Sequence, residues 1–310
     1  MSEASPLSQT YIIAISGPTA SGKTTLARLL QQTFDGLEFT PANNGIPVAI
    51  TASILHQDDF FVPEDRIPLK RVPKVDAPGE FVEQADWDCL ESIDFTKLKC
   101  CLQKLRQAGY NGKEGHARIL REIGIEAKEE TNSVGPARVT EAEFREAREK
   151  ILRDLVGVVG DAQVTTPSTM LSQTQKIHVL LVEGFLFYFN ETPQCPELPS
   201  LMCLFDTRLL LHTTLERALL RRRDRMSYVT VEGFFDDPPG YIENIVWPNY
   251  VMYHQHLFTN GDVERGQLNK WARQEAGIKR QEREGMGMRD LLEWGAGLVA
   301  EVIVVGIRTR

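Results

Sequence analysis

The sequence lacks the features that mark several large classes of protein. Its 310 residues include five cysteines, with no Cys-x-x-Cys pair and no histidine at zinc-like spacing, which excludes a fold built on disulfides or structural zinc. The longest apolar runs, residues 177–189 and 294–306, are too short to span a bilayer, and each contains a glutamate. The first ten residues have no signal-peptide pattern. We therefore expect a globular protein of the cytoplasm, with access to the nucleus left open.

The chain also lacks an excess of positive charge. Its 35 lysines and arginines stand against 43 aspartates and glutamates, a formal net charge of -8. Because no broad basic surface is implied, neither nucleic acid nor a membrane is an expected partner. Hydrophobic residues make up 42% of the chain and charged residues 25%, which is ordinary for a folded domain. We expect one domain over residues 1–310, with a monomer favoured.

Short apolar runs alternate with segments of helical spacing. Strands are predicted at residues 11–16, 47–55, 177–182 and 201–205, and helices at residues 25–34 and 208–225. The run at 177–182 does not alternate with polar residues, as expected of a parallel strand covered on both faces. The pattern predicts an α/β fold, a three-layer sandwich with a parallel central sheet and helices on both faces.

Three further segments stand outside this alternation. Residues 107–176 have no strand pattern and nearly equal numbers of acidic and basic residues, which predicts an insertion with a solvated, charged helical face. Within it, Thr140 and Glu143 have the spacing of a helix capping box. Residues 224–241 are predicted to form a lid loop. A last helix is predicted at 288–300, after which the apolar run 302–307 is either an edge strand or a packing arm.

The strongest motif is a glycine loop between the first strand and the first helix. It reads Gly-Pro-Thr-Ala-Ser-Gly-Lys-Thr over residues 17–24. Its glycines let successive backbone N–H groups face phosphate oxygens at a helix N-terminus. Lys23 is predicted to reach the β- and γ-phosphates of a nucleoside triphosphate, and the Thr24 hydroxyl to bind Mg²⁺. The predicted nucleotide-binding set is Gly17, Ala20, Ser21, Gly22, Lys23, Thr24 and Thr25.

Acidic residues follow the second and third predicted strands. Asp58 and Asp59 come after residues 47–55, where a carboxylate can accept the proton of an attacking hydroxyl or bind Mg²⁺, or can cap a helix. Glu183 ends the strand at 177–182, a position typical of an acidic residue that faces the metal of a phosphate-loop site. Open α/β sheets bind ligands at the carboxyl ends of their strands.

Arginines close the helix that follows the fourth predicted strand. The segment Arg221-Arg222-Arg223-Asp224-Arg225 offers several forked donors for phosphate oxygens. The alternative is that these cations stabilise the C-terminus of their own helix. That effect explains one or two of the arginines better than it explains four.

In order along the chain, the motifs resemble those of one family. These are the glycine loop, His-Gln-Asp-Asp-Phe-Phe at 56–61, Asp-Trp-Asp at 86–88, Val-Glu-Gly-Phe-Leu at 182–186, the arginine cluster, Asp-Pro-Pro-Gly-Tyr at 237–241 and Asn-Gly-Asp-Val-Glu at 260–264. They resemble the nicotinamide riboside kinases, in the uridine-kinase-like branch of phosphate-loop kinases, and are most similar to the fungal form. The resemblance covers most of residues 11–266.

The resemblance implies a role for each matching residue. Asp58 accepts the proton of the riboside 5′-hydroxyl and, with Thr24 and Glu183, organises Mg²⁺. Asp88 and Arg222 contact the ribose hydroxyls. The implied ring site and lid use further residues: Trp87 and Tyr228 on the two faces of the base, Asp59 and Phe61 in the same substrate site, Arg221 and Arg225 over the ATP phosphates, and Val263 near adenine. Aromatic faces attract a cation such as the pyridinium of nicotinamide riboside.

The activity implied is ATP- and Mg²⁺-dependent phosphorylation of nicotinamide riboside, and of nicotinic acid riboside, for NAD salvage. Lys23, Asp58 and Glu183 are the catalytic candidates. A uridine or cytidine kinase is the alternative within the same fold, although no residue stands out as a donor to a pyrimidine base. A nucleotide-binding scaffold protein with little catalysis is the alternative of another class, and it predicts a damaged catalytic set.

Overall fold

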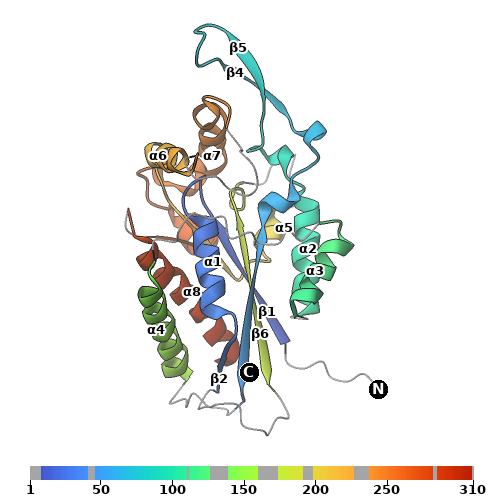
Figure 1. The fold of residues 1–310 in the computed structure, drawn as a ribbon, viewed down its shortest axis with the longest axis vertical. Coiled ribbons are helices and arrows are strands. Elements are labelled where there is room, and N and C mark those ends of the chain that lie inside the picture. The colour runs from blue at the N-terminus through green and yellow to red at the C-terminus, as the bar shows by residue number, and fades with distance from the viewer. Residues whose placement is uncertain are drawn as a thin grey trace.

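The computed structural model describes residues 8–40, 46–109, 112–125, 139–159, 174–190, 198–226, 237–281 and 285–308. Six strands form the main sheet in the order β2-β3-β6-β1-β7-β8 (Figure 1). Their bounds are Ser8–Ser16 (β1), Leu37–Phe39 (β2), Val48–His56 (β3), Gln175–Gly184 (β6), Thr207–Leu210 (β7) and Ile278–Arg280 (β8). All neighbours are parallel except β2, which runs antiparallel to β3. The α/β class predicted from the sequence is confirmed.

The central strands are apolar throughout because both of their faces are covered. Along β1, Ile12 and Ala14 belong to one hydrophobic cluster, whereas Ile13 and Ile15 belong to the cluster on the opposite face. Strand side chains alternate between the faces of a sheet, so a strand buried on both faces shows no polar alternation.

Helices cover the sheet on both sides and give it three layers (Figure 1). One face packs against α1 (Lys23–Phe34), α4 (Glu141–Val159) and α8 (Met288–Arg308), which share a cluster with odd-numbered β1 residues. The other face packs against α2 (Phe95–Ala108), α3 (Gly112–Glu122) and α5 (Leu198–Met202). The loops at the carboxyl ends of the strands lead to α6 (Leu215–Met226) and α7 (Trp247–His254).

A two-stranded hairpin projects beyond the carboxyl ends of the sheet (Figure 1). It consists of β4 (Leu69–Pro73) and β5 (Phe81–Ala85), and the sequence pattern did not predict it. Short 3₁₀ turns lie at Gln57–Phe60, Glu64–Arg66, Leu90–Ser92, Gln255–Leu257 and Thr259–Gly261, and π-helical turns at Ile242–Val246 and Trp271–Glu275. None of the helices among the described residues is long and apolar enough to cross a membrane.

Strand register brings the predicted site residues to one edge of the sheet. Ser16, the last residue before the glycine loop, pairs with Gly184, and His56 pairs with Glu183. The loop after β1, the turn after β3 and the end of β6 therefore meet at the same edge, although they are far apart in sequence.

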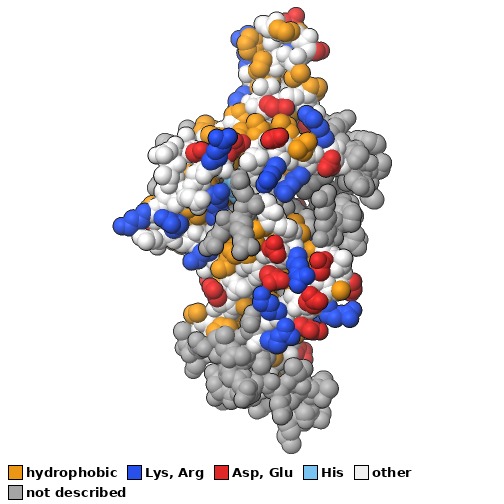
Figure 2. Space-filling view, turned by 90° about the vertical axis from the view of Figure 1, so that its left-hand side faces the viewer, with side chains coloured by type: hydrophobic (Ala, Val, Ile, Leu, Met, Phe, Trp, Pro, Cys, Tyr) orange, Lys and Arg blue, Asp and Glu red, His pale blue; other side chains and the backbone are white. Residues whose placement is uncertain are grey.

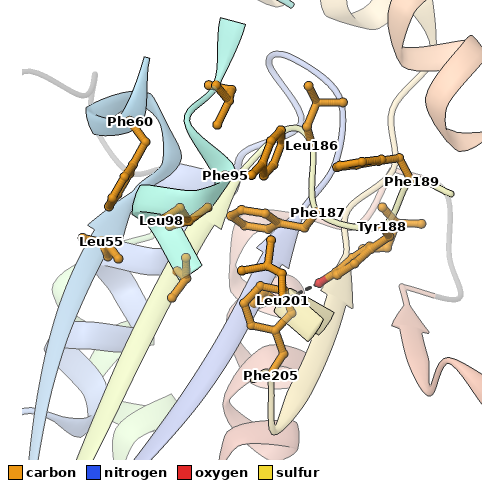
Figure 3. Close-up of a cluster of buried hydrophobic side chains, with 14 of the residues drawn as sticks. Leu55, Phe60, Phe95, Leu98, Leu186, Phe187, Tyr188, Phe189, Leu201 and Phe205 are labelled. Carbon is orange, nitrogen blue, oxygen red and sulfur yellow. Dashed lines mark hydrogen bonds between the residues drawn. The ribbon is translucent and has the colours of Figure 1, made fainter. Parts of the chain in front are cut away.

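Two expectations about the second half of the chain were wrong. The apolar run 201–205 is not a strand: Leu198–Met202 is helical, the strand is β7 at Thr207–Leu210, and the helix after it begins at Leu215 rather than near 208. A five-residue apolar run fits a buried helix as well as a strand, and here Leu201 packs from α5 into the core (Figure 3). The run 302–307 is neither an edge strand nor an arm, because it continues α8. The edge strand is β8, which the sequence pattern did not predict.

The described part of residues 107–176 contributes to the core as well as to the surface. Ile119 and Leu120 of α3 are buried in the cluster beneath the sheet. The capping box predicted for α4 is confirmed, since the Thr140 hydroxyl accepts from the Glu143 N–H and the Thr140 N–H donates to the Glu143 carboxylate. Residues 110–111, 126–138 and 160–173 lie outside the described residues.

Ion pairs join α4 to α8 on the surface. Lys150 binds Glu293 at 2.8 Å, and Arg289 binds Glu146 at 3.0 Å. Figure 2 shows acidic and basic side chains intermixed on this side of the molecule, below the projecting hairpin. This mixture of charges agrees with the solvated helical face expected from the sequence.

An aromatic run after β6 fills the core beneath the carboxyl edge (Figure 3). Phe187, Tyr188 and Phe189 are fully or almost fully buried. The Tyr188 hydroxyl lies 3.1 Å from both the Ala14 and the Leu209 carbonyl oxygens, and so joins this run to β1 and β7. The run thereby holds the strand that leads into the glycine loop.

Tyr188→Phe should lower the free energy of unfolding by about 1 kcal/mol, because it removes the only hydroxyl that bridges these two carbonyls among the described residues. The measurement is denaturant unfolding of the purified variant. Tyr250→Phe is the matched control, since the buried Tyr250 hydroxyl has no hydrogen-bond partner in the described structure. Equal stability of the Tyr188 and Tyr250 variants would contradict this account of the bridge.

Candidate functional site

The glycine loop has the backbone geometry that a phosphate site requires. Gly17 has φ of 149°, and a Cβ on it would lie 2.6 Å from the Leu211 carbonyl oxygen, so a side chain cannot fit there. Gly22 has φ of 101° and immediately precedes the first residue of α1. The N-terminal N–H groups of the 12-residue α1 have no partners within the helix and therefore face the loop, where an anion is favoured.

Three side chains of the loop and of the first turn of α1 have surroundings that are compatible with the functions predicted for them. The Lys23 ammonium donates to the Pro18 carbonyl oxygen at 2.9 Å, which holds it across the loop. The Thr24 hydroxyl donates to Glu183 Oε1 at 3.1 Å. The Ser21 hydroxyl is buried and has no hydrogen-bond partner in the described part of the chain. A buried polar atom without a partner is unfavourable, and a phosphate oxygen would satisfy it, so the loop fits a nucleotide.

Glu183 forms the centre of the acidic part of the site. It is buried at the end of β6, and its Oε1 lies 2.7 Å from His56 Nδ1 and 3.1 Å from the Thr24 hydroxyl. Burial alone would raise its pKa, but the hydrogen bond with His56 and the charge of Lys23 bring the pKa below its usual value. Glu183 therefore stays ionised next to the hydroxyl of Thr24.

Asp58 lies on the 3₁₀ turn that follows β3 and opens into the same cleft. Asp58 is an exposed residue, but nearby protein atoms still desolvate its carboxylate. This desolvation, together with the charge of Glu183, raises the pKa of Asp58 to about 6. Lys23 and His56 act in the opposite direction. Asp58 is thus ionised at neutral pH but closer to protonation than an ordinary aspartate, a property suited to accepting a proton.

These residues fit a magnesium ion that also binds nucleotide phosphates. The described structure contains no cluster of three or more His, Cys, Asp or Glu side chains that could hold a metal on its own. Mg²⁺ is commonly bound by one or two carboxylates together with phosphate oxygens. Thr24, Asp58 and Glu183 offer that kind of incomplete set.

Aromatic and acidic side chains line the rest of the cleft, which has a volume of about 430 Å³. Phe61 lies edge-on to Trp87, with ring centroids 5.2 Å apart, and stacks on Phe185 at 6.2 Å. Asp88 lines the cleft beside Trp87 and accepts a hydrogen bond from the Tyr241 hydroxyl at 3.0 Å. The cleft therefore combines aromatic surface with carboxylates within reach of the glycine loop.

Two of the predicted arginines lie against the glycine loop. Arg221 donates to the Ala20 carbonyl oxygen at 2.9 Å. Arg222 donates to the Thr19 hydroxyl at 2.7 Å and makes a two-pronged pair with Asp237 at 2.8 Å. The side chain of Arg225 and all of Tyr228 lie outside the described residues, as does most of the lid loop predicted at 224–241.

The cleft unites most, but not all, of the residues predicted for the site. Its walls include Ala20, Gly22, Lys23, Thr24, Asp58, Phe61, Trp87, Asp88, Glu183 and Arg222. Gly17 and Ser21 lie in the glycine loop beside these walls, and Thr25 follows in α1. Asp59 is not among the residues that line the cleft, and Val263 is buried in the hydrophobic core.

Sequence reasoning assigned no role to His56 or Tyr241, both of which contact site residues directly. The motif strings contain them, but their partners come from distant segments: His56 binds Glu183, and Tyr241 binds Asp88. A larger groove of about 860 Å³ lies between β8 and α8, and none of the predicted site residues line it.

Comparison with known proteins agrees with the motifs. No family model matches the chain. It is 28% identical over 295 residues to the nicotinamide riboside kinase of Schizosaccharomyces pombe, covering 95% of this chain and 98% of that protein. It is 26% identical to the nicotinamide riboside kinase of Saccharomyces cerevisiae (82% and 81% covered) and 24% identical to human nicotinamide riboside kinase 1 (80% and 79%). The predicted resemblance to this family is confirmed.

Asp88→Asn should stabilise the folded protein at neutral pH. Burial, with the nearby charge of Asp86, raises the pKa of Asp88 from 3.8 to about 6, so its ionised form is less favourable in the folded than in the unfolded state. This destabilisation is absent below pH 3.8, grows between pH 3.8 and about 6, and is fully present above that.

The stability advantage of the Asp88→Asn variant should therefore grow over that interval, to the order of 1 kcal/mol. Denaturant unfolding of both proteins at several pH values measures it. A difference that does not change with pH, or a less stable variant at neutral pH, would contradict the assignment.

Proposed function

We propose that the chain is an ATP- and Mg²⁺-dependent kinase that phosphorylates the 5′-hydroxyl of nicotinamide riboside, and of nicotinic acid riboside, in NAD salvage. The observation that carries the proposal is the lining of one cleft: Asp58, Lys23 of the glycine loop, and the aromatic, acidic wall with Trp87 all face the same space. The relatives named as nicotinamide riboside kinases support the same activity at modest identity.

The glycine loop would hold the ATP phosphates. Backbone N–H groups at the start of α1 and the Lys23 ammonium supply positive charge where the β- and γ-phosphates would lie. Thr24, Asp58 and Glu183 would hold Mg²⁺, which when bound neutralises charge on the phosphates. Arg221 donates to the Ala20 carbonyl oxygen of the loop and so is placed to add charge at the transferring group. Arg222, which donates to the Thr19 hydroxyl, would contact the ribose hydroxyls together with Asp88.

Asp58 would act on the acceptor. Ionised at neutral pH, it can take the proton of the riboside 5′-hydroxyl as that oxygen attacks the γ-phosphate. Phosphoryl transfer needs little covalent chemistry from the protein, so correct placement of the two substrates accounts for most of the catalysis.

The remaining wall suits a cationic riboside. The Asp88 carboxylate can accept hydrogen bonds from the ribose 2′- and 3′-hydroxyls. Trp87 and Phe61 offer aromatic surface, which attracts a pyridinium ring by about 0.5–2 kcal/mol. We propose that Tyr228 and Arg225 complete the site from the lid, over the ring and the phosphates respectively. We also propose that Asp59 contributes to the riboside site and that Val263 lies near adenine.

The oligomeric state, the partners and the compartment complete the proposal. We propose a monomer that acts on small molecules and not on nucleic acid, because the chain is acidic and the predicted site residues gather in a cleft of small-molecule size. We propose the cytoplasm as its compartment, since the described cysteines Cys89, Cys100, Cys101 and Cys203 are all free.

Asp58→Asn should lower kcat for nicotinamide riboside at least about 100-fold, because the amide cannot accept the hydroxyl proton, while ATP affinity changes less than about threefold. Chromatography of the mononucleotide formed in the presence of ATP and Mg²⁺ measures kcat. Calorimetry measures the affinity for ATP. Asp65→Asn, at an exposed aspartate on a neighbouring 3₁₀ turn, is the control. More than a tenth of wild-type kcat in the Asp58 variant would exclude Asp58 as the base.

A further inference from the structure

One hydroxyl group contacts both residues of the Trp87-Asp88 pair. Tyr241 Oη donates to Asp88 Oδ2 at 3.0 Å and accepts from the Trp87 backbone N–H at 3.2 Å. The orientation of the Asp88 carboxylate and the position of the Trp87 backbone are therefore tied to the same atom. Tyr241 lies 153 residues further along the chain, at the last position of the predicted lid loop.

The ring of Tyr241 has little freedom to move. It is buried in a small hydrophobic cluster with Val72 of the projecting hairpin and with Ile245 and Val246. Its backbone N–H donates to the Pro238 carbonyl oxygen at 2.9 Å, which fixes the turn that leads into it. Because both ring and backbone are held, the hydroxyl is a fixed point for Asp88.

The carboxylate of Asp86, two residues before Asp88, accepts hydrogen bonds from other groups. Asp86 accepts hydrogen bonds from the Asn249 amide nitrogen with both of its oxygens, at 2.7 and 3.0 Å, and from the Asp88 backbone N–H at 3.1 Å. Lys70 donates to Asn249 at 3.1 Å and lies 3.9 Å from Asp86. Asp86 thus shapes the turn, but its negative charge also repels the Asp88 carboxylate.

Among the described residues, Tyr241 is the side chain that donates a hydrogen bond to the Asp88 carboxylate. Arg222, whose charge lowers the pKa of Asp88, itself donates hydrogen bonds to Asp237 and Thr19. A bond from Tyr241 to Oδ2 leaves Oδ1 and the remaining lone pairs of Asp88 free to accept hydrogen bonds from a ligand.

We propose that Tyr241 is a positioning residue for the riboside: it orients Asp88 toward the ribose hydroxyls and sets the Trp87 backbone, and so determines riboside affinity without touching the reacting atoms. This inference rests on the proposed function. It adds the last residue of the predicted lid loop to the substrate site.

The test is Tyr241→Phe, which removes the hydroxyl and leaves the buried ring. The KM for nicotinamide riboside should rise about tenfold, as expected for loss of a hydrogen bond to a charged group, while kcat and the KM for ATP stay within about twofold. Tyr250→Phe removes the same atom from another buried tyrosine whose hydroxyl has no partner in the described structure, and should leave all three constants unchanged. Melting temperatures of both variants verify that they are folded.

A double-mutant cycle with Asp88→Asn shows whether Tyr241 acts through Asp88. Adding Tyr241→Phe to Asp88→Asn should raise the riboside KM no more than about threefold further, since the charged partner is already absent. An unchanged KM in Tyr241→Phe, or an equal effect in both backgrounds, would overturn the positioning role. If the wild-type protein does not phosphorylate nicotinamide riboside, the proposed function itself fails, and the wild-type arm alone reveals it.

Discussion

The contact of the Glu183 carboxylate with the Thr24 hydroxyl and the His56 ring is the interaction on which the site depends. It joins segments at the carboxyl ends of three parallel strands, because Glu183 lies at the end of β6, His56 ends β3 and Thr24 lies in the first turn of the helix after β1. A buried carboxylate is unfavourable unless donors or cations surround it, and here both are present. The same contact places Asp58, two residues after His56, next to the glycine loop.

The rest of the cleft has an excess of negative charge close to aromatic rings, and this charge affects both stability and ligand preference. Asp58 and Asp88 both have pKa values raised to about 6, in part by neighbouring carboxylates. Such a site is unfavourable for the isolated protein, and a cationic ligand would relieve the repulsion. The pyridinium ring of nicotinamide riboside is a cation, whereas uridine is neutral. Stability and recognition therefore make opposite demands on Asp88, a pattern common at functional sites.

The position of the local parts of this candidate site could be predicted from the sequence, whereas their roles stay predictions. The glycine loop, Asp58 and Glu183 are set by strand ends and short spacings, so pattern and motif sufficed to place them at one edge. The strand at 201–205 was wrong because a short apolar run fits a buried helix equally well, and β8 was missed because three residues carry almost no periodic signal. Tyr241 went unassigned because its bonds to Trp87 and Asp88 depend on tertiary packing against the projecting hairpin. Tyr228 stays a prediction, outside the described residues.

In the proposed reaction, phosphate passes from ATP to a cationic pyridine riboside within one cleft. The most direct measurement compares kcat/KM for nicotinamide riboside, nicotinic acid riboside, uridine and cytidine, with ATP and Mg²⁺, in one ADP-release assay. We expect a kcat/KM at least about tenfold higher for nicotinamide riboside than for either pyrimidine nucleoside, a difference on the order of the aromatic attraction for the charged ring. Preference for uridine or cytidine, or no turnover of any of the four, would contradict the proposed reaction.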